Sequence, residues 1–191
     1  MKTSPDIKKI VIIGPESTGK STLCTELAHH YNTLWVPEYA REFLLKKENR
    51  YDYNDLLTIA KNQLLLEDQY AEKLKKQLTE NATSAYSPLL FIDTDMYVMK
   101  VWCEFVFGEC HPWILEKIAE RKYDFYLLCN TDLPWVKDEF REYPDLEIRQ
   151  RLFSIYKDIM VNQSTPWALI SGNNEQRLQS ATREIDNHFH I

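Results

Sequence analysis

The sequence Gly14-Pro-Glu-Ser-Thr-Gly-Lys-Ser21 matches the phosphate-binding loop (P-loop) pattern G-x-x-x-x-G-K-[ST] at every fixed position. Gly14 and Gly19 allow the backbone to curl so that consecutive N–H groups point at phosphate oxygens. Lys20 supplies a cation near the β- and γ-phosphates, and Ser21 supplies a hydroxyl for Mg²⁺. The chain has only four glycines, so chance is a poor explanation of the match. We expect a nucleoside triphosphate to contact Gly14, Glu16, Ser17, Thr18, Gly19, Lys20, Ser21 and Thr22.

The segments on both sides of the P-loop have the character that the motif requires. Residues 8–13 are a short run rich in β-branched residues, which is typical of a buried parallel strand. Residues 20–31 carry Leu23, Leu27 and Tyr31 at helical spacing, which predicts a helix that begins in the loop. The N–H groups at the start of such a helix attract an anion. The motif therefore lies in the strand, loop and helix context of a nucleotide site.

The rest of the chain alternates between predicted strands and predicted helices. Further strands are expected at 33–37, 88–93, 123–129 and 167–171, and further helices at 38–47, 53–76, 96–107, 112–121, 146–161 and 174–188. This alternation predicts a three-layer α/β fold in which helices cover both faces of a five-stranded parallel sheet. Residues 130–145 combine charged residues with two prolines and are expected to form a lid after the fourth strand. We expect residues 1–191 to form a single domain.

Composition limits the classes of function. The chain has 191 residues, of which 44% are hydrophobic, and a formal charge of -6. This acidic balance argues against a protein that coats nucleic acid. No apolar run reaches the roughly 18 residues of a membrane span, and residues 1–6 contain no apolar targeting segment. We therefore expect a cytoplasmic protein whose cysteines are free thiols rather than disulfide or zinc ligands: Cys24, Cys103, Cys110 and Cys129.

Ligands of a parallel α/β sheet gather at the carboxyl ends of its strands, and this rule selects candidate site residues. The residues just beyond the predicted strands are Gly14, Glu38, Asp93, Asn130 and Ser171. Asp93 ends an apolar run, as expected of a carboxylate that holds Mg²⁺ opposite Ser21. Asp95 lies two residues further on. It either faces the same cleft or caps the helix that begins near Met96.

Phosphoryl transfer commonly uses a carboxylate that accepts or orients a hydroxyl proton, and arginines that neutralise charge. Glu38 is a candidate for the carboxylate, and Asp95 is the alternative. Glu38 is alternatively a surface residue of a first helical turn, paired with Arg41. For the arginine we select Arg141 in the lid. The next helix carries two further arginines, Arg149 and Arg151, and the sequence fits either this role or an exposed surface position for each.

Several blocks of sequence together carry a family resemblance. They are the P-loop block 14–23, Glu38-Tyr-Ala-Arg-Glu-Phe43, Phe91-Ile-Asp-Thr-Asp95, residues 108–112 and Pro134-Trp-Val-Lys-Asp-Glu-Phe-Arg141. Their order and spacing resemble the ribosylnicotinamide kinase domain of the NadR type, in the P-loop kinase superfamily. That domain transfers the γ-phosphate of ATP to the 5′-hydroxyl of nicotinamide riboside. The resemblance runs from about residue 9 to 172.

The resemblance implies a P-loop kinase fold with ATP and Mg²⁺ as cofactors. It is consistent with the roles argued above, metal ligation by Ser21 and Asp93 and catalytic roles for Lys20, Glu38, Asp93 and Arg141. It also implies a nucleoside site formed around the Glu38 block, the long predicted helix 53–76 and the Asp93 block, for which we select Trp35, Glu38, Tyr39, Arg41 and Asp95. Two departures concern the acceptor base and the lid. Pro37 stands where relatives have an aromatic residue, and the lid differs at Lys137, Glu139 and Phe140.

We therefore expect an ATP-dependent kinase of a small nucleoside, with nicotinamide riboside as the leading acceptor and without nucleic-acid or membrane partners. Larger relatives carry further domains ahead of the kinase. Only seven residues precede the first predicted strand, so the kinase step alone is expected. One alternative is a kinase of another nucleoside or small metabolite. The other is a switch protein that binds ATP and a protein partner without transferring phosphate.

Overall fold

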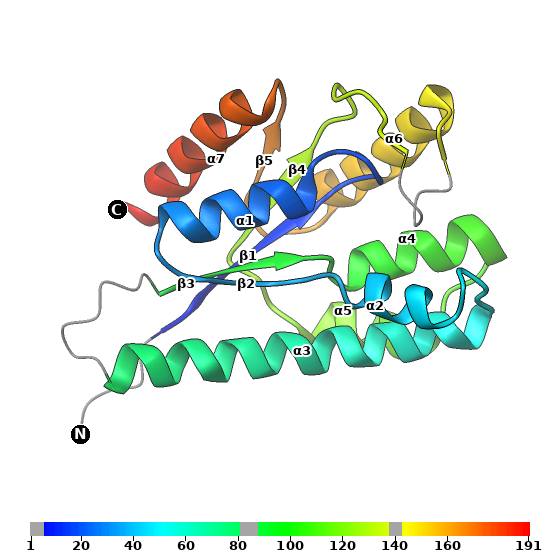
Figure 1. The fold of residues 1–191 in the computed structure, drawn as a ribbon, viewed down its shortest axis with the longest axis horizontal. Coiled ribbons are helices and arrows are strands. Elements are labelled where there is room, and N and C mark those ends of the chain that lie inside the picture. The colour runs from blue at the N-terminus through cyan, green and yellow to red at the C-terminus, as the bar shows by residue number, and fades with distance from the viewer. Residues whose placement is uncertain (1–5, 81–87, 138–142) are drawn as a thin grey trace.

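The computed structural model describes residues 6–80, 88–137 and 143–191 (Figure 1). Its centre is a sheet of five parallel strands in the order β2-β3-β1-β4-β5. The strands are β1 (Lys8–Ile13), β2 (Leu34–Val36), β3 (Leu89–Asp93), β4 (Phe125–Cys129) and β5 (Trp167–Ile170). The side chains of β1 alternate between two hydrophobic clusters. Ile10 and Ile12 pack on one face of the sheet, whereas Val11 and Ile13 pack on the other.

Helices cover both faces of the sheet. One face is covered by α1 (Lys20–His30) and α7 (Asn174–Phe189), which lie above the sheet in Figure 1. The other face is covered by α3 (Tyr53–Glu80), α4 (Met96–Phe107) and α6 (Leu146–Asn162). The predicted three-layer α/β fold with a five-stranded parallel sheet is therefore confirmed.

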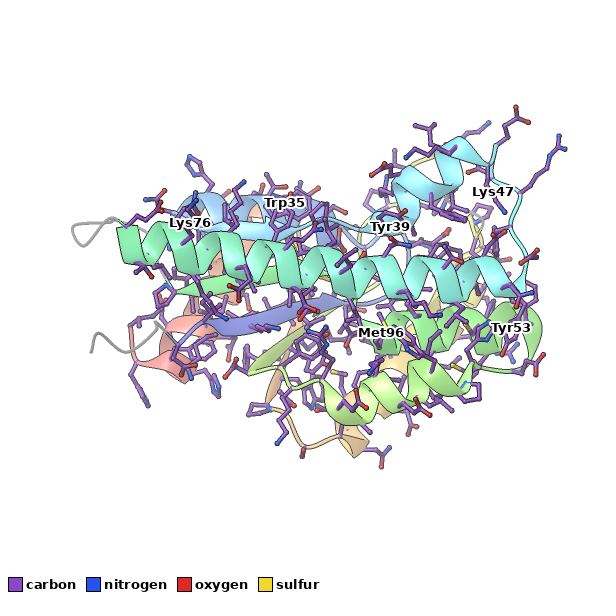
Figure 2. The ribbon with its side chains drawn as sticks, turned by 90° about the horizontal axis from the view of Figure 1, so that it is seen from below. Trp35, Tyr39, Lys47, Tyr53, Lys76 and Met96 are labelled. Carbon is purple, nitrogen blue, oxygen red and sulfur yellow. The ribbon has the colours of Figure 1, made fainter. Side chains whose placement is uncertain are left out.

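A third hydrophobic cluster extends the fold beyond the carboxyl edge of the sheet. It joins α2 (Tyr39–Lys46), the first half of α3, α4 and α5 (Pro112–Glu120). Figure 2 looks onto α3, with Tyr39 at the start of α2 on one side of it and Met96 at the start of α4 on the other. This cluster fixes α2 and α4 beside the strand ends, where a ligand of a parallel sheet is expected.

The element boundaries agree with the sequence prediction within a few residues. Helix α3 ends at Glu80 rather than Lys76, because Leu78 adds a further contact to the second cluster. Strand β4 begins at Phe125 rather than Tyr123. Within the described residues, no helix is long and apolar enough to cross a membrane. Of the cysteines, only Cys110 is partly exposed, and all four are free thiols.

Candidate nucleotide and acceptor site

The P-loop lies directly against the end of β4. Gly14 has φ 140°, and a Cβ atom at this position would lie 2.7 Å from the carbonyl oxygen of Cys129. Gly19 has φ 77° and precedes the first residue of α1. Any side chain at Gly14 would push the loop away from the sheet, and any L-residue at Gly19 would be strained. The two glycines thus hold the backbone close to the strand ends.

Side chains of the P-loop brace its curve from within. The Thr18 hydroxyl is fully buried and donates to the carbonyl of Pro15 at 2.8 Å. The Lys20 ammonium donates to the same carbonyl, also at 2.8 Å. Lys20 therefore lies across the loop, with its charge on the side where the phosphates of a nucleotide would lie.

Ser21 and Asp93 meet where β3 ends beside β1. The Ser21 hydroxyl donates to Asp93 Oδ2 at 2.5 Å. The other oxygen, Oδ1, is buried and has no hydrogen-bond partner among the described residues. Burial raises the pKa of Asp93 to about 6, with a further contribution from the charge of Glu38. A hydroxyl and an unsatisfied carboxylate oxygen are hard ligands that fit Mg²⁺, which binds few protein groups and completes its shell with phosphates and water.

Asp95 does not line the cleft, so its predicted place beside Asp93 is corrected. Its Oδ1 accepts from the backbone N–H groups of Tyr97 and Val98, and its Oδ2 accepts from the Tyr126 hydroxyl at 2.8 Å. Asp95 is thus the N-cap of α4, the alternative named above. The physical reason is Thr94, whose φ of 88° breaks the extended backbone and turns Asp95 away from Asp93. Burial raises the pKa of Asp95 to about 6.

Glu38 lies at the start of α2 and lines the cleft. Its side chain makes no cap hydrogen bond; instead Arg41 Nε donates to Glu38 Oε2 at 3.2 Å. The ion pair with Arg41 that the sequence suggested is therefore present. Both residues of the pair line the cleft. The buried side chain of Gln63 fixes this turn: Oε1 accepts from Tyr39 N at 2.7 Å, and Nε2 donates to Pro37 O at 3.3 Å.

One cavity of about 630 Å³ joins the P-loop to a second, largely apolar pocket. The P-loop half contains every nucleotide-contacting residue expected from the sequence. The other half lies between α2, α4 and α6, and Trp35 and Tyr39 also line the cavity. Its wall consists of Val98, Val101, Trp102, Phe105, Val106, Tyr143, Leu152 and Tyr156. An apolar pocket with few polar groups, adjoining a phosphate site, has the character of a small-molecule site.

The lid segment contacts the variable positions of the P-loop. Glu16 Oε1 accepts from Tyr143 N at 2.6 Å and from Trp135 Nε1 at 3.4 Å. The N–H of Val136 donates to Ser17 Oγ at 3.2 Å. Trp135 is therefore half-buried rather than exposed. Arg141, the predicted lid arginine, lies outside the described residues.

The two arginines of α6 differ in their surroundings. Arg149 is 4% exposed, and its Nε and Nη1 atoms have no hydrogen-bond partner in the part of the chain that the structure describes. It shares the buried face of α6 with Leu152 and Tyr156, both of which line the cavity. Arg151 is exposed and lies over the ring of Phe105 at 5.7 Å. Arg149 alone combines burial with unsatisfied donors, the condition in which binding an anion is most favourable.

Two buried polar residues near the site were not selected from the sequence. Gln63 occupies a position on the apolar stripe of α3, and Arg177 occupies one on the buried face of α7. The sequence did contain one signal for both residues: each is a polar side chain at a position where the helical periodicity predicts a buried apolar one. Such a residue must find partners in the fold, although its spacing does not name them.

Comparisons with known proteins agree with this geometry. A P-loop whose hydroxyl meets a carboxylate at the end of the adjacent strand defines a P-loop nucleotide-binding fold. A protein-family model described as an AAA domain matches residues 9–177, and the chain belongs to this family. It is also homologous to the NadR proteins. The trifunctional NAD biosynthesis/regulator proteins NadR of Salmonella typhimurium and Escherichia coli K12 are each 32% identical to it over 139 residues.

The relatives are longer than this chain. The match covers 71% of this chain but 31% of each NadR protein. Among solved structures, NadR in complex with NR superposes with a TM-score of 0.76 at 19% identity, covering 97% of this chain and 50% of that one. The thymidylate kinase of Ehrlichia chaffeensis superposes with a TM-score of 0.64 at 15% identity, covering 98% of this chain and 100% of that one. At these identities the structures establish a shared fold.

Proposed function

We propose that the protein is an ATP-dependent kinase that phosphorylates the 5′-hydroxyl of a nucleoside, with nicotinamide riboside as the leading acceptor. The observation that carries the proposal is the continuity of the cavity. One space of about 630 Å³ connects the P-loop with an aromatic and aliphatic pocket between α2, α4 and α6. A switch protein needs the first half alone, whereas a kinase of a small molecule needs both halves in contact.

In the proposed reaction the 5′-hydroxyl oxygen attacks the γ-phosphorus of ATP. The bond from that phosphorus to the bridging oxygen breaks, ADP leaves with the bonding electrons, and the hydroxyl proton passes to Glu38. With Asp95 engaged as a helix cap, Glu38 is the candidate base, since it lines the cavity beside the P-loop. Arg41 holds the Glu38 carboxylate, and Gln63 holds the turn that carries it.

Charge neutralisation in this scheme comes from Lys20 and from Arg149, with Arg141 retained as a prediction. Lys20 lies on the P-loop, and Arg149 lies on the same buried face of α6 as Leu152 and Tyr156, which line the cavity, with two guanidinium nitrogens that have no partner among the described residues. Mg²⁺ held by Ser21 and Asp93 would neutralise charge on the β- and γ-phosphates.

The chemistry of the acceptor pocket supports a flat base, and a cationic one in particular. Aromatic rings line the pocket, and Glu38 and Glu42 add carboxylates at its rim. The base of nicotinamide riboside is a positively charged pyridinium, which aromatic faces and carboxylates both favour. The homology with NadR proteins also supports this acceptor. NadR has been crystallised with NR and with NAD and AMP-PNP.

The test is a screen for ATP consumption over a panel of nucleosides, with the phosphorylated product identified by mass spectrometry. We expect rapid ADP release only when an acceptor is added, and nicotinamide mononucleotide as the product with nicotinamide riboside. Reduced nicotinamide riboside has nearly the same size without the positive charge, so it is the matched control for recognition of charge. Faster turnover with another nucleoside would show that this nucleoside, rather than nicotinamide riboside, is the acceptor. Slow ATP hydrolysis that no acceptor stimulates would refute the kinase and favour the switch.

A further inference from the structure

Arg177 connects three loops at the carboxyl edge of the sheet. It lies on the inner face of α7, and only 2% of its surface is exposed. Its Nε donates to Gly172 O at 2.7 Å, its Nη1 to Thr18 O at 3.0 Å, and its Nη2 to Asn130 O at 2.9 Å. These carbonyls belong to the loop after β5, the P-loop and the end of β4. One guanidinium thus joins three segments that are far apart in the sequence.

Packing alone does not explain an arginine at this position. The same face of α7 continues with Ala181 and Ile185, both fully buried and apolar. Burying a guanidinium costs several kcal/mol of solvation unless its donors are all satisfied. Here each of the three nitrogens has a partner, and four of the five N–H groups are accounted for, because Asp132 also forms an ion pair with Nη2. An apolar side chain would fill the space at lower cost, so the guanidinium must supply the orientation of the carbonyls it binds.

Peptide geometry transmits this orientation to the P-loop. The carbonyl of Thr18 and the N–H of Gly19 belong to one planar trans peptide and point in opposite directions. Arg177 binds that carbonyl from within the fold, so the N–H of Gly19 is turned toward the opposite, cavity side of the loop. The Thr18 hydroxyl fixes the same residue to Pro15 O, which prevents the peptide from rotating back.

We propose that Arg177 is a positioning residue for the polyphosphate of a nucleoside triphosphate. It holds the Thr18–Gly19 peptide so that the Gly19 amide faces the phosphates, and it fixes the P-loop to the ends of β4 and β5. This inference rests on the proposed function only in that the P-loop binds a triphosphate. It requires no particular acceptor.

The experiment measures the affinity for a non-hydrolysable ATP analogue and the amide signal of Gly19. The substitutions are Arg177→Met, which keeps the length without donors, and Arg177→Lys, which keeps the charge without the planar fork. Arg183→Met is the control, since Arg183 lies on the same helix with 67% of its side chain exposed. The chain has four glycines, so ¹⁵N-glycine labelling gives four amide signals. Gly108 is the internal reference, because it ends α4, which packs on the opposite face of the sheet from α7.

We expect Arg177→Met to weaken binding of the analogue about 10- to 100-fold, the range for lost hydrogen bonds of a charged group. The Gly19 and Gly172 signals should shift, the Gly108 signal should stay, and the acceptor KM should not change. Arg177→Lys should show a smaller change of the same kind. A third substitution, Arg177→Ala, leaves a space that free guanidinium can occupy, so millimolar guanidinium should restore analogue binding to this variant.

Each outcome decides the proposal. A folded Arg177→Met protein with wild-type affinity and an unshifted Gly19 signal would overturn it. If Arg177→Met does not fold, Arg177→Lys decides by the same two measurements. Equal loss of ATP and acceptor binding, without rescue by guanidinium, would show a purely structural role. If the wild-type protein binds no nucleotide at all, the proposed kinase function is refuted, and the role of Arg177 with it. If the wild-type protein binds the analogue but the Arg177 variants bind it equally well, only the role of Arg177 is refuted.

Discussion

The two halves of the cavity are built in different ways. The phosphate-binding half consists of residues 14–22 with Asp93, and it relies on backbone N–H groups, two glycines and a few charged side chains. The acceptor half consists of the wall formed by α2, α4 and α6, and it relies on side chains from three helices. A short stretch of sequence determines the first half. The second depends on how distant helices pack together, so its chemistry follows from the fold.

The largest effect should come from the phosphate-binding half. Lys20→Ala should reduce turnover by about 10³- to 10⁵-fold, because it removes a cation beside the transferred phosphoryl group. The fold should remain, since Lys20 is half-exposed and, among the described residues, donates only to the Pro15 carbonyl. Steady-state kinetics and circular dichroism check this, with Lys157→Ala on the exposed face of α6 as the control. A folded variant with near wild-type turnover would remove the role of the P-loop in catalysis.

Glu38 lies between the two halves, so its substitution tests whether they act together. Glu38→Gln keeps the size and hydrogen bonding of the side chain but removes its basicity. If Glu38 accepts the hydroxyl proton, kcat should fall by about 10²- to 10⁴-fold while ATP affinity stays nearly unchanged. The measurement uses saturating ATP and Mg²⁺ with varied nicotinamide riboside. A raised acceptor KM with unchanged kcat would instead assign Glu38 to holding the ribose.

Sequence prediction succeeded where local patterns determine structure. The P-loop, the order of strands and helices, and the meeting of Ser21 with Asp93 all follow from a motif and from short-range periodicity. For Asp95 it left two places open, the cleft and the helix cap, and the structure has the cap, because a positive φ at Thr94 interrupts the alternation expected in a strand. No local sequence pattern predicts a positive φ at a threonine.

The buried polar residues of the helices could be predicted only in part, for a different reason. Spacing identifies Gln63, Arg149 and Arg177 as members of buried helix faces, but it does not identify their partners. Gln63 finds the Pro37–Tyr39 turn, Arg177 finds three carbonyls, and Arg149 finds none among the described residues. These differences arise from tertiary packing. They distinguish a structural polar group from one available to a ligand.

Arg149 offers a test in which activity and stability should change in opposite directions. Arg149→Met removes a buried guanidinium with unsatisfied donors, so the free energy of unfolding should rise by about 1 kcal/mol or more. If Arg149 neutralises the transferring phosphoryl group, turnover should fall by about 10²-fold. Denaturant unfolding and kinetics measure the two effects. Arg151→Met is the control, because Arg151 is exposed on the same helix. A loss of stability in Arg149→Met would show that the guanidinium has a structural role.

The smallest effect should come from the acceptor half, where contacts are many and individually weak. Tyr156 is buried in the wall and lines the cavity, and burial together with the charges of Asp95 and Glu38 raises the pKa of its hydroxyl. The hydroxyl is therefore neutral at pH 7 and available as a donor near Glu38. Tyr156→Phe removes the hydrogen bond that this hydroxyl would donate to a bound acceptor, worth about 0.5 to 1.5 kcal/mol, and should raise the acceptor KM by at most about 10-fold. The ATP KM and kcat should stay within a factor of about 2, as expected when binding is lost equally from the ground state and the transition state.

Tyr123→Phe is the matched control, because the Tyr123 hydroxyl bonds to Glu67 and does not line the cavity. An equal rise in the ATP KM would show that the two halves of the cavity do not bind their ligands independently, and it would contradict the distinction between them.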